Sequence, residues 1–230
     1  ELSNISFKIE KGQTLAIIGA TGSGKTTLIS LIPRFYDATE GEVLVDGVNV
    51  KNYKFDTLYD KLGYVTQKAV LFAGSIRENV FFGESGAPET DEELSNAIAL
   101  SQAEEFVNKL PDGTEHMISQ MGRNVSGGQK QRLSIARALS RKPEILVFDD
   151  SFSALDYKTD AKLREGLNEK LKDTTKIIVA QRISTIRHAD KIIVLDRGEA
   201  VGMGTHEELM KSCDVYKEIA LSQLSAAELA

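Results

Sequence analysis

A glycine-rich turn that ends in a lysine and two threonines lies near the start of the chain. Its spacing is Gly19, four residues, Gly24, Lys25 and Thr26, between an apolar stretch and a helical one. Such a turn points successive backbone N–H groups into one concavity at a helix N-terminus, where their dipoles attract phosphate oxygens. Because both flanking elements are correct for a P-loop, an ordinary glycine-rich turn is disfavoured. The residues predicted to bind a nucleotide here are Gly19, Ala20, Thr21, Gly22, Ser23, Gly24, Lys25, Thr26 and Thr27.

Two adjacent carboxylates, Asp149 and Asp150, follow the apolar run Ile145–Phe148. An aspartate at the end of a strand is by itself more often a turn or capping residue. In a chain with a P-loop, Asp149 is better interpreted as a residue that holds Mg²⁺ through water. The Thr26 hydroxyl would bind the same ion, and Lys25 would reach the β- and γ-phosphates. ATP and Mg²⁺ are therefore the predicted cofactors.

The elements that position these residues are short apolar strands alternating with helices. A helix is predicted over Thr26–Ile32, ended by Pro33. Strands that alternate with helices predict a mainly parallel sheet covered on both faces. The predicted strands are Asn4–Ile9, which alternates apolar and polar residues as an edge strand does, followed by Thr14–Ile18, Glu42–Asp46, Leu62–Thr66, Ile145–Phe148, Lys176–Ala180 and Lys191–Leu195.

The pattern changes between about residues 74 and 140. Strand signals are absent from this stretch, and Asp91–Leu100, Ala103–Leu110 and Gly127–Leu139 read as helices. We expect a helical lobe inserted between strands of the sheet. A further helical segment, Glu207–Ala230, is polar enough to lie on the surface.

The amino-acid composition favours a globular protein domain over nucleic-acid-binding, disulfide-bonded and membrane-spanning classes. The 230 residues are 41% hydrophobic and 27% charged, with a net charge of −6, which fits a globular domain and disfavours a dedicated nucleic-acid surface. Cys213 is the one cysteine, so an internal disulfide is impossible and a reducing compartment fits best. No apolar run has the length of a membrane span. Since the chain begins at Glu1 with a strand pattern close behind, we expect it to be part of a longer protein.

One further segment, Asn124-Val-Ser-Gly-Gly-Gln129, is the most specific sign of a resemblance to a known protein family. Together with the P-loop, Gln67 and Ser153-Ala-Leu-Asp156, it resembles the nucleotide-binding domain of ABC transporters. The stretch Leu71–Asn79 is similar to the corresponding stretch of multidrug and lipid exporters. The resemblance implies an α/β fold of the P-loop NTPase (RecA-like) class, with a mainly parallel core, a small antiparallel β subdomain and an inserted helical subdomain.

The resemblance also implies a domain organisation. Residues 1–230 would form a single nucleotide-binding domain. Residues 1–73 and 141–230 would form the ATP-binding core with its β subdomain, and residues 74–140 the helical signature subdomain. The transmembrane domain would lie outside this chain.

In such domains two copies pack head to tail around the nucleotides, which assigns further roles by resemblance. Gln67 would contact nucleotide, Mg²⁺ and the attacking water, and Asp156 would contact the partner domain. A helix N-terminus that begins with Ser126 can receive a phosphate of the partner's nucleotide, and Ser126 can also cap its own helix. The residues of this signature loop are Ser126, Gly127, Gly128 and Gln129.

Two positions depart from the family pattern at the predicted catalytic centre. Asp150 stands where glutamate normally polarises the attacking water, and its reach is shorter by about 1.5 Å, a misplacement that can cost about a hundredfold in rate. Gln181 stands where histidine normally contacts the γ-phosphate, and an amide cannot carry charge near neutral pH. We therefore expect a slow site. The alternative is that Asp150 serves as an adequate base after slight closure.

These departures predict the degenerate-site half of a heterodimeric bacterial multidrug exporter, where "degenerate" means a site with substituted catalytic residues. Its partners would be a second, non-identical nucleotide-binding domain and transmembrane domains that dock through coupling helices, without nucleic acid. It would lie at the cytoplasmic face of the membrane. One alternative is a homodimeric, fully active ATPase of an exporter. The other, a non-transport ABC ATPase acting on DNA or ribosomes, is disfavoured by the acidic balance and by Leu71–Asn79.

Overall fold

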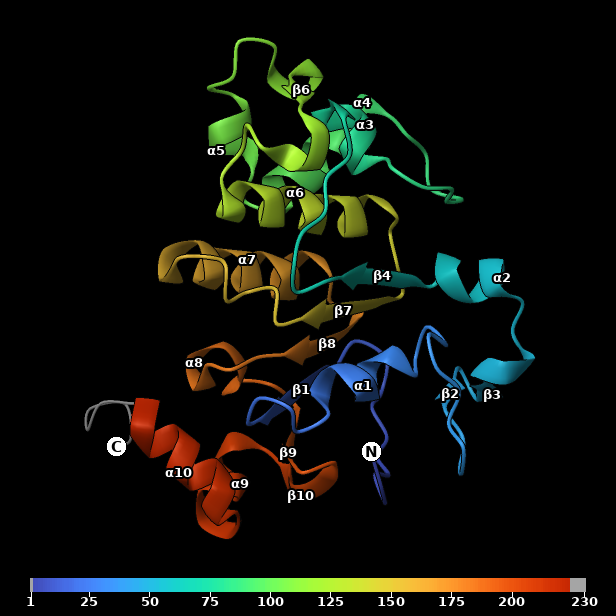
Figure 1. The fold of residues 1–230 in the computed structure, drawn as a ribbon, viewed down its shortest axis with the longest axis vertical. Coiled ribbons are helices and arrows are strands. Elements are labelled where there is room, and N and C mark those ends of the chain that lie inside the picture. The colour runs from blue at the N-terminus through green and yellow to red at the C-terminus, as the bar shows by residue number, and fades with distance from the viewer. Residues whose placement is uncertain (1, 224–230) are drawn as a thin grey trace.

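A six-stranded sheet forms the centre of the computed structural model, which describes residues 2–223 (Figure 1). The strand order is β10-β9-β1-β8-β7-β4, parallel except for β10, which pairs antiparallel with β9. The parallel sheet predicted from the alternating pattern is confirmed. The strands are β1 (Thr14–Gly19), β4 (Leu62–Val65), β7 (Ile145–Asp149), β8 (Thr175–Val179), β9 (Lys191–Asp196) and β10 (Glu199–Gly204).

The strand order brings the predicted site residues to one edge of the sheet. Strand β8 lies between β1 and β7, and all three run in the same direction. The carboxyl ends of these three strands therefore lie at the same edge of the sheet, which is where open α/β sheets bind ligands. The P-loop follows β1, Asp150 follows β7, and Gln181 follows β8.

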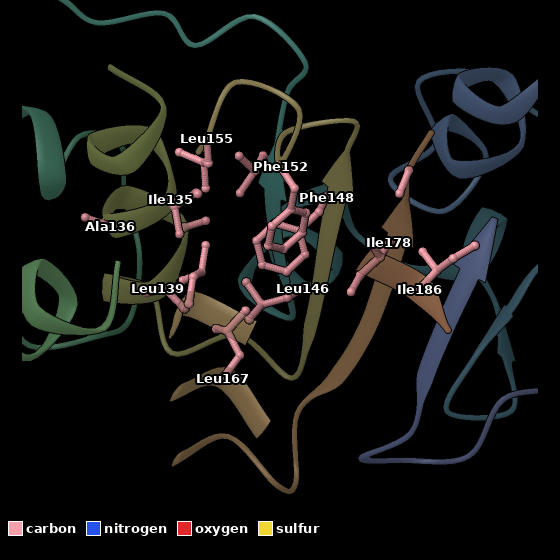
Figure 2. Close-up of a cluster of buried hydrophobic side chains, with 14 of the residues drawn as sticks. Ile135, Ala136, Leu139, Leu146, Phe148, Phe152, Leu155, Leu167, Ile178 and Ile186 are labelled. Atoms are coloured by element: carbon pink, nitrogen blue, oxygen red, sulfur yellow. The ribbon is translucent and has the colours of Figure 1, made fainter. Parts of the chain in front are cut away.

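Side chains of the strands alternate between two buried clusters, one on each face of the sheet. Ala16 and Ile18 of β1 belong to the larger cluster, and Leu15 and Ile17 to the smaller one. Helix α1 (Lys25–Ser30) covers the smaller cluster, whereas α6 (Gly127–Ser140) and α7 (Tyr157–Lys170) contribute to the larger. In Figure 2, Phe148 of β7 and its neighbour Phe152 lie between α6 side chains and Ile178 of β8.

The helical lobe contains α3 (Ile76–Val80), α4 (Asp91–Leu100), α5 (Glu104–Val107) and α6. The three helices predicted there are confirmed, with α5 shorter than expected. The expectation of a lobe without strands was wrong, because β5 (Gly74–Ser75) pairs antiparallel with β6 (Met117–Ile118). Strands of two residues are too short to produce an alternating pattern. Short 3₁₀ turns, η2 (Gly113–Glu115) and η3 (Gln120–Gly122), flank β6.

A small antiparallel hairpin precedes β4, as expected, although its first strand is shorter than predicted. Strands β2 (Leu44–Val45) and β3 (Val48–Asn49) flank Asp46 and Gly47, whose φ angles of 52° and 76° suit a two-residue hairpin turn. The 3₁₀ turn η1 (Val50–Asn52) and helix α2 (Phe55–Asp60) then lead into β4.

The strand predicted over Asn4–Ile9 was wrong, because these residues adopt no regular structure. The apolar positions of the pattern are nevertheless used: Ile5 and Ile9 pack against the smaller cluster. The backbone of this region meets the sheet near its start, where Ser3 N–H donates to the Gly198 carbonyl at 2.9 Å. Phe7, between them, is 36% exposed, so this segment packs on the sheet without the alternating burial of a strand.

The C-terminal segment folds as α8 (Ile183–Ile186), α9 (His206–Ser212) and α10 (Asp214–Gln223). The helix predicted over Glu207–Ala230 is thus two helices as far as residue 223, and residues 224–230 lie outside the described part. One face of the pair is buried through Leu209, Tyr216 and Ala220, so the segment is not only a surface element. Over residues 2–223, no helix combines the length and apolarity that crossing a membrane requires.

Candidate nucleotide-binding site

The P-loop joins β1 directly to α1, and its lysine is turned back onto the loop. The Lys25 Nζ donates to the carbonyls of Gly19 and Ala20, both at 2.8 Å. Burial lowers the pKa of Lys25, an effect that the nearby carboxylates of Asp150 and Asp149 oppose. These contacts place the ammonium group within the curve of the loop, where the motif predicts that phosphate binds.

Two glycines of the P-loop stand where a side chain would not fit. A Cβ atom on Gly19 would lie 2.1 Å from the Leu195 carbonyl oxygen, a backbone atom that has little freedom to move. Gly24 adopts a φ of 104° at the N-terminus of α1. Residues with a Cβ rarely adopt that conformation. The backbone curl that forms the phosphate cradle therefore depends on glycine at both positions.

The P-loop is also anchored to the turn between β9 and β10. Gly198 N–H donates to the Ser23 carbonyl at 3.0 Å. The Ser23 hydroxyl is buried, and among the described residues it has no hydrogen-bond partner. A buried hydroxyl without a partner is costly. It is thus available to a polar ligand group that enters the loop.

Thr26 and Asp149 meet where the sequence predicts Mg²⁺. The Thr26 hydroxyl donates to Asp149 Oδ1 at 3.0 Å, and burial raises the pKa of Asp149, helped by the neighbouring Asp150. Hydroxyl and carboxylate oxygens are the hard donors that Mg²⁺ prefers, so these two residues fit the ion. They line a cavity of about 500 Å³ together with Thr27, Ser30, Phe35, Tyr36, Tyr64 and Thr66.

Asp150 lies at the centre of a hydrogen-bonded group that joins three predicted positions. Its Oδ2 atom accepts from Gln181 Nε2 at 2.6 Å and from Gln67 Nε2 at 3.1 Å. The carboxylate is 6% exposed, and its backbone has a φ of 47°, in the left-handed region. Asp150 N–H donates to the Val179 carbonyl at 3.0 Å, which fixes this turn to β8. Asp150 and Gln181, the two residues predicted to be catalytic, are therefore direct hydrogen-bond partners.

The signature loop lies in the helical lobe, at the N-terminus of α6. Ser126 Oγ accepts from Gln129 N–H at 3.2 Å, and Gln129 Oε1 accepts from Ser126 N–H at 2.8 Å. This reciprocal pair is a capping box. The predicted capping by Ser126 is thus confirmed. Ser126 and Gly127 are exposed, which leaves the start of α6 open to another molecule.

Asp156 caps the N-terminus of α7 rather than joining the group around Asp150. Its carboxylate accepts from Thr159 N–H at 3.0 Å and from the Thr159 hydroxyl at 2.7 Å, and these bonds lower its pKa. The adjacent Tyr157 is 68% exposed, and Arg182 lies over its ring with 4.7 Å to the centroid. Tyr157 follows β7 and Arg182 follows β8, so the segments after these two strands are also in contact at this exposed position.

Gln131 is a buried polar residue near the site that the sequence motifs do not include. It is 1% exposed within α6, and its Nε2 donates to the Thr66 carbonyl at 3.2 Å. This bond ties the signature helix to the residue before Gln67. The sequence does hold a signal for it, because a glutamine among buried residues of an amphipathic helix needs a hydrogen-bond partner.

The sequence model of the family described as "ABC transporter" matches residues 2–153. The chain belongs to the ABC transporter family. An uncharacterised ABC transporter ATP-binding protein of Mycobacterium tuberculosis is 47% identical over 98% of this chain and 39% of its own length. A putative multidrug export ATP-binding/permease protein of Staphylococcus aureus is 44% identical over 95% of this chain and 37% of its own.

A solved structure gives the same result for the ABC transporter fold. A bacterial Atm1-family ABC exporter with ATP bound superposes with a TM-score of 0.91 at 36% identity, over 96% of this chain and 39% of that one. The predicted fold class is confirmed: a mainly parallel α/β core with small antiparallel sheets. This chain spans about two fifths of the length of the relatives that it matches.

Proposed function

We propose that this chain is the ATP-binding, energy-coupling domain of an ABC exporter and that it holds MgATP at a slowly hydrolysing site. The P-loop residues from Gly19 to Thr27 would bind the phosphates, with Lys25 supplying the charge. Thr26 and Asp149 would hold Mg²⁺, which neutralises phosphate charge when bound. The likeness to an exporter with ATP bound supports this assignment.

The hydrogen bonds of Asp150 are the observation that carries the slow-site proposal. One carboxylate oxygen already accepts two amide N–H groups, at 2.6 Å from Gln181 and 3.1 Å from Gln67. These two bonds occupy lone pairs of that oxygen, so it is already engaged and less free to accept a hydrogen bond from an attacking water. Gln181 in turn does not titrate near neutral pH and cannot act as an acid or a base. Both groups would hold nucleotide and water in place without accepting a proton efficiently.

The signature loop is intact, which supports donation to a partner. Ser126, Gly127, Gly128 and Gln129 keep the family pattern, and the exposed start of α6 presents backbone N–H groups that suit a phosphate. In a homodimer both sites would carry Asp150 and Gln181. A non-identical partner domain that supplies the consensus residues would instead form a competent site with this signature loop. Asp156 would contact that partner near the exposed Tyr157.

Exposed aromatic residues support contact with a transmembrane domain. Phe35 and Tyr36 are 54% and 67% exposed beside the predicted Mg²⁺ site. The exposed rings of Phe72 and Phe82 stack with centroids 4.1 Å apart, and the half-buried Arg137 guanidinium lies over both rings. Clustered exposed apolar side chains mark interaction sites. We propose that a coupling helix docks here, which puts the chain at the cytoplasmic face of the membrane.

Single-turnover cleavage of labelled ATP by the assembled protein tests this proposal. Wild type should retain uncleaved nucleotide at this chain's site, and Asp150→Glu combined with Gln181→His should cleave it, faster by about a hundredfold. A matched control, Asp173→Glu with Gln120→His, changes the same residue types at exposed positions and should leave retention unchanged. Equal cleavage of both nucleotides by wild type would instead identify Asp150 as a working base and favour the fully active alternative.

A further inference from the structure

Gln223, the last residue of α10, reaches the turn that carries Gln181. Its Oε1 accepts from Ile183 N–H at 2.8 Å, and its Nε2 donates to the Gln181 carbonyl at 2.8 Å. One amide side chain thus satisfies a backbone donor and a backbone acceptor on either side of Arg182. The contact joins residues 40 and 42 positions apart in the sequence.

These backbone groups would otherwise lack partners within the turn. Ile183 is the first residue of α8, and N–H groups in the first turn of a helix have no partner inside it. The residue at the capping position, Arg182, makes no side-chain cap bond. Gln223 therefore supplies from α10 the cap that the local sequence does not provide.

Helix α10 is itself firmly held, so the contact can define a position. Tyr216 is fully buried, and its hydroxyl lies 2.8 Å from His206 Nδ1 at the start of α9. On the other side of the turn, the Thr185 hydroxyl of α8 donates to the buried Asp160 of α7 at 3.1 Å. The segment after β8 is thus tied to α7 and to α10.

Helix α10 also forms one wall of a cavity beside the P-loop. The cavity has a volume of about 300 Å³, and Gly19, Ala20, Thr21 and Gln181 line its P-loop side. The residues of α10 that line it are Val215, Glu218, Ile219 and Gln223. The same helix therefore borders the phosphate end of the proposed site and holds the backbone of Gln181.

We propose that Gln223 is a positioning residue, which fixes the Gln181 backbone so that the Gln181 amide reaches Asp150 and retains the nucleotide. The inference rests on the proposed function, because it assigns a role in nucleotide retention. We call the two hydrogen bonds from Gln223 to Ile183 and Gln181 the clamp. Losing the clamp would leave the turn around Arg182 free to move and would weaken the bond between Gln181 and Asp150. The rate of ATP association depends on the P-loop and should change less than about twofold.

The test compares three variants in the assembled protein. Gln223→Ala removes both hydrogen bonds, Gln223→Glu keeps the acceptor but loses the donor, and Ser222→Ala is the control. The Ser222 hydroxyl bonds the Ile219 carbonyl of its own helix at 2.7 Å and does not reach the turn. Two quantities are measured: hydrogen exchange of the Ile183 amide, and the dissociation rate of ATP.

Gln223→Ala should raise both the exchange of Ile183 and the rate of ATP dissociation by about threefold to tenfold, as expected for losing one or two ordinary hydrogen bonds. Gln223→Glu should keep Ile183 protected yet still speed dissociation. Unchanged exchange in Gln223→Ala would overturn the clamp, and faster exchange with unchanged dissociation would overturn its role in retention. Absence of ATP binding in wild type would contradict the proposed function itself. The exchange comparison would still show whether the clamp exists.

Discussion

The hydroxyl of Thr26, in the first turn of α1, donates a hydrogen bond of 3.0 Å to the carboxylate of Asp149 at the end of β7. The two residues are 123 positions apart in the sequence and come together because β8 alone separates β1 from β7 in the sheet. Burial raises the pKa of Asp149, because the ionised carboxylate is poorly solvated in this position. A bound cation would compensate for the lost solvation.

Replacing Thr26 by valine keeps the shape of the side chain and removes the hydroxyl. We expect ATP affinity in the presence of Mg²⁺ to fall about tenfold, or about 1.4 kcal/mol, because the hydroxyl would no longer contact the ion. Affinity measured with a chelator present should change little. Thr57→Val, at an exposed position of α2 outside the P-loop, is the control. Equal losses with and without Mg²⁺ would show that Thr26 acts on the phosphates instead.

Asp150→Asn distinguishes a working base from a positioning carboxylate. If Asp150 does not accept the proton, single-turnover cleavage at this site should fall by less than about threefold, whereas loss of a true general base costs 10² to 10⁴. Asp149→Asn is a matched comparison, since both carboxylates are 6% exposed. We expect that change to abolish Mg²⁺-dependent cleavage. A hundredfold loss in Asp150→Asn would refute the slow-site proposal.

His206 should make the stability of the domain depend on pH. Burial lowers its pKa, as do the nearby Arg187 and His188, against the opposing effect of Glu207. The folded state therefore favours the neutral ring, which lies 2.8 Å from the Tyr216 hydroxyl. Its stabilisation is present above the ordinary pKa of histidine and is lost as pH falls through the lowered value.

We expect the melting temperature of wild type to fall between pH 7 and pH 5 by more than that of His206→Gln, which accepts a hydrogen bond but does not titrate in that range. Thermal unfolding at both pH values measures the difference. His116→Gln, in the helical lobe, should follow wild type. Identical pH profiles for wild type and His206→Gln would exclude this residue as the source.

Gly19→Ala tests how closely the P-loop approaches β9. The added Cβ would lie 2.1 Å from the Leu195 carbonyl oxygen, so the loop must shift. Overpacking of this kind costs about 1–3 kcal/mol, and we expect ATP affinity to fall as well. Denaturant unfolding and ATP titration measure the two effects. Gly86→Ala, where an added Cβ meets nothing within 4 Å, should be close to neutral, and equal effects at both glycines would contradict the steric explanation.

Phe148→Ala should be among the most destabilising single changes in the core. The side chain is fully buried, with its ring 4.9 Å from that of Phe152 (Figure 2). Truncating a buried phenylalanine costs about 3–5 kcal/mol, measured by denaturant unfolding. Phe55→Ala, at a residue 49% exposed, should cost less than about 1 kcal/mol. A small loss at Phe148 would mean that the cluster collapses around the gap.

The central strands could be predicted because burial leaves a strong pattern. Thr14–Ile18 and Ile145–Phe148 are continuous apolar runs, which is typical of strands covered on both faces. The P-loop and the signature loop are local motifs, so their residues are recognisable without knowing the fold. The meeting of Asp150 with Gln181 followed only once the strand order was known, because no local spacing connects them.

The features that the sequence did not predict share one physical cause. The pattern of apolar and polar residues indicates which side chains are buried, but not which backbone segments pair. Ile5 and Ile9 alternate with polar residues and pack on the sheet, yet their segment pairs with no strand. Strands β5 and β6 pair but are too short to show a pattern. Gln223 is an exposed glutamine at the end of a helix, and its link to Gln181 spans 42 positions. A contact of that kind leaves no sequence signal.

Asp150 and Gln181 both stand on loops just beyond the ends of their strands, outside the two apolar clusters. A substitution at either position therefore leaves the packing of the sheet intact. Aspartate and glutamate codons are separated by a single nucleotide, and so are those of glutamine and histidine. The difference between a hydrolysing and a retaining site is thus a short mutational distance across a scaffold that does not have to change. Under the proposed function, drift at these two loops would be sufficient to convert a hydrolysing site into a retaining one.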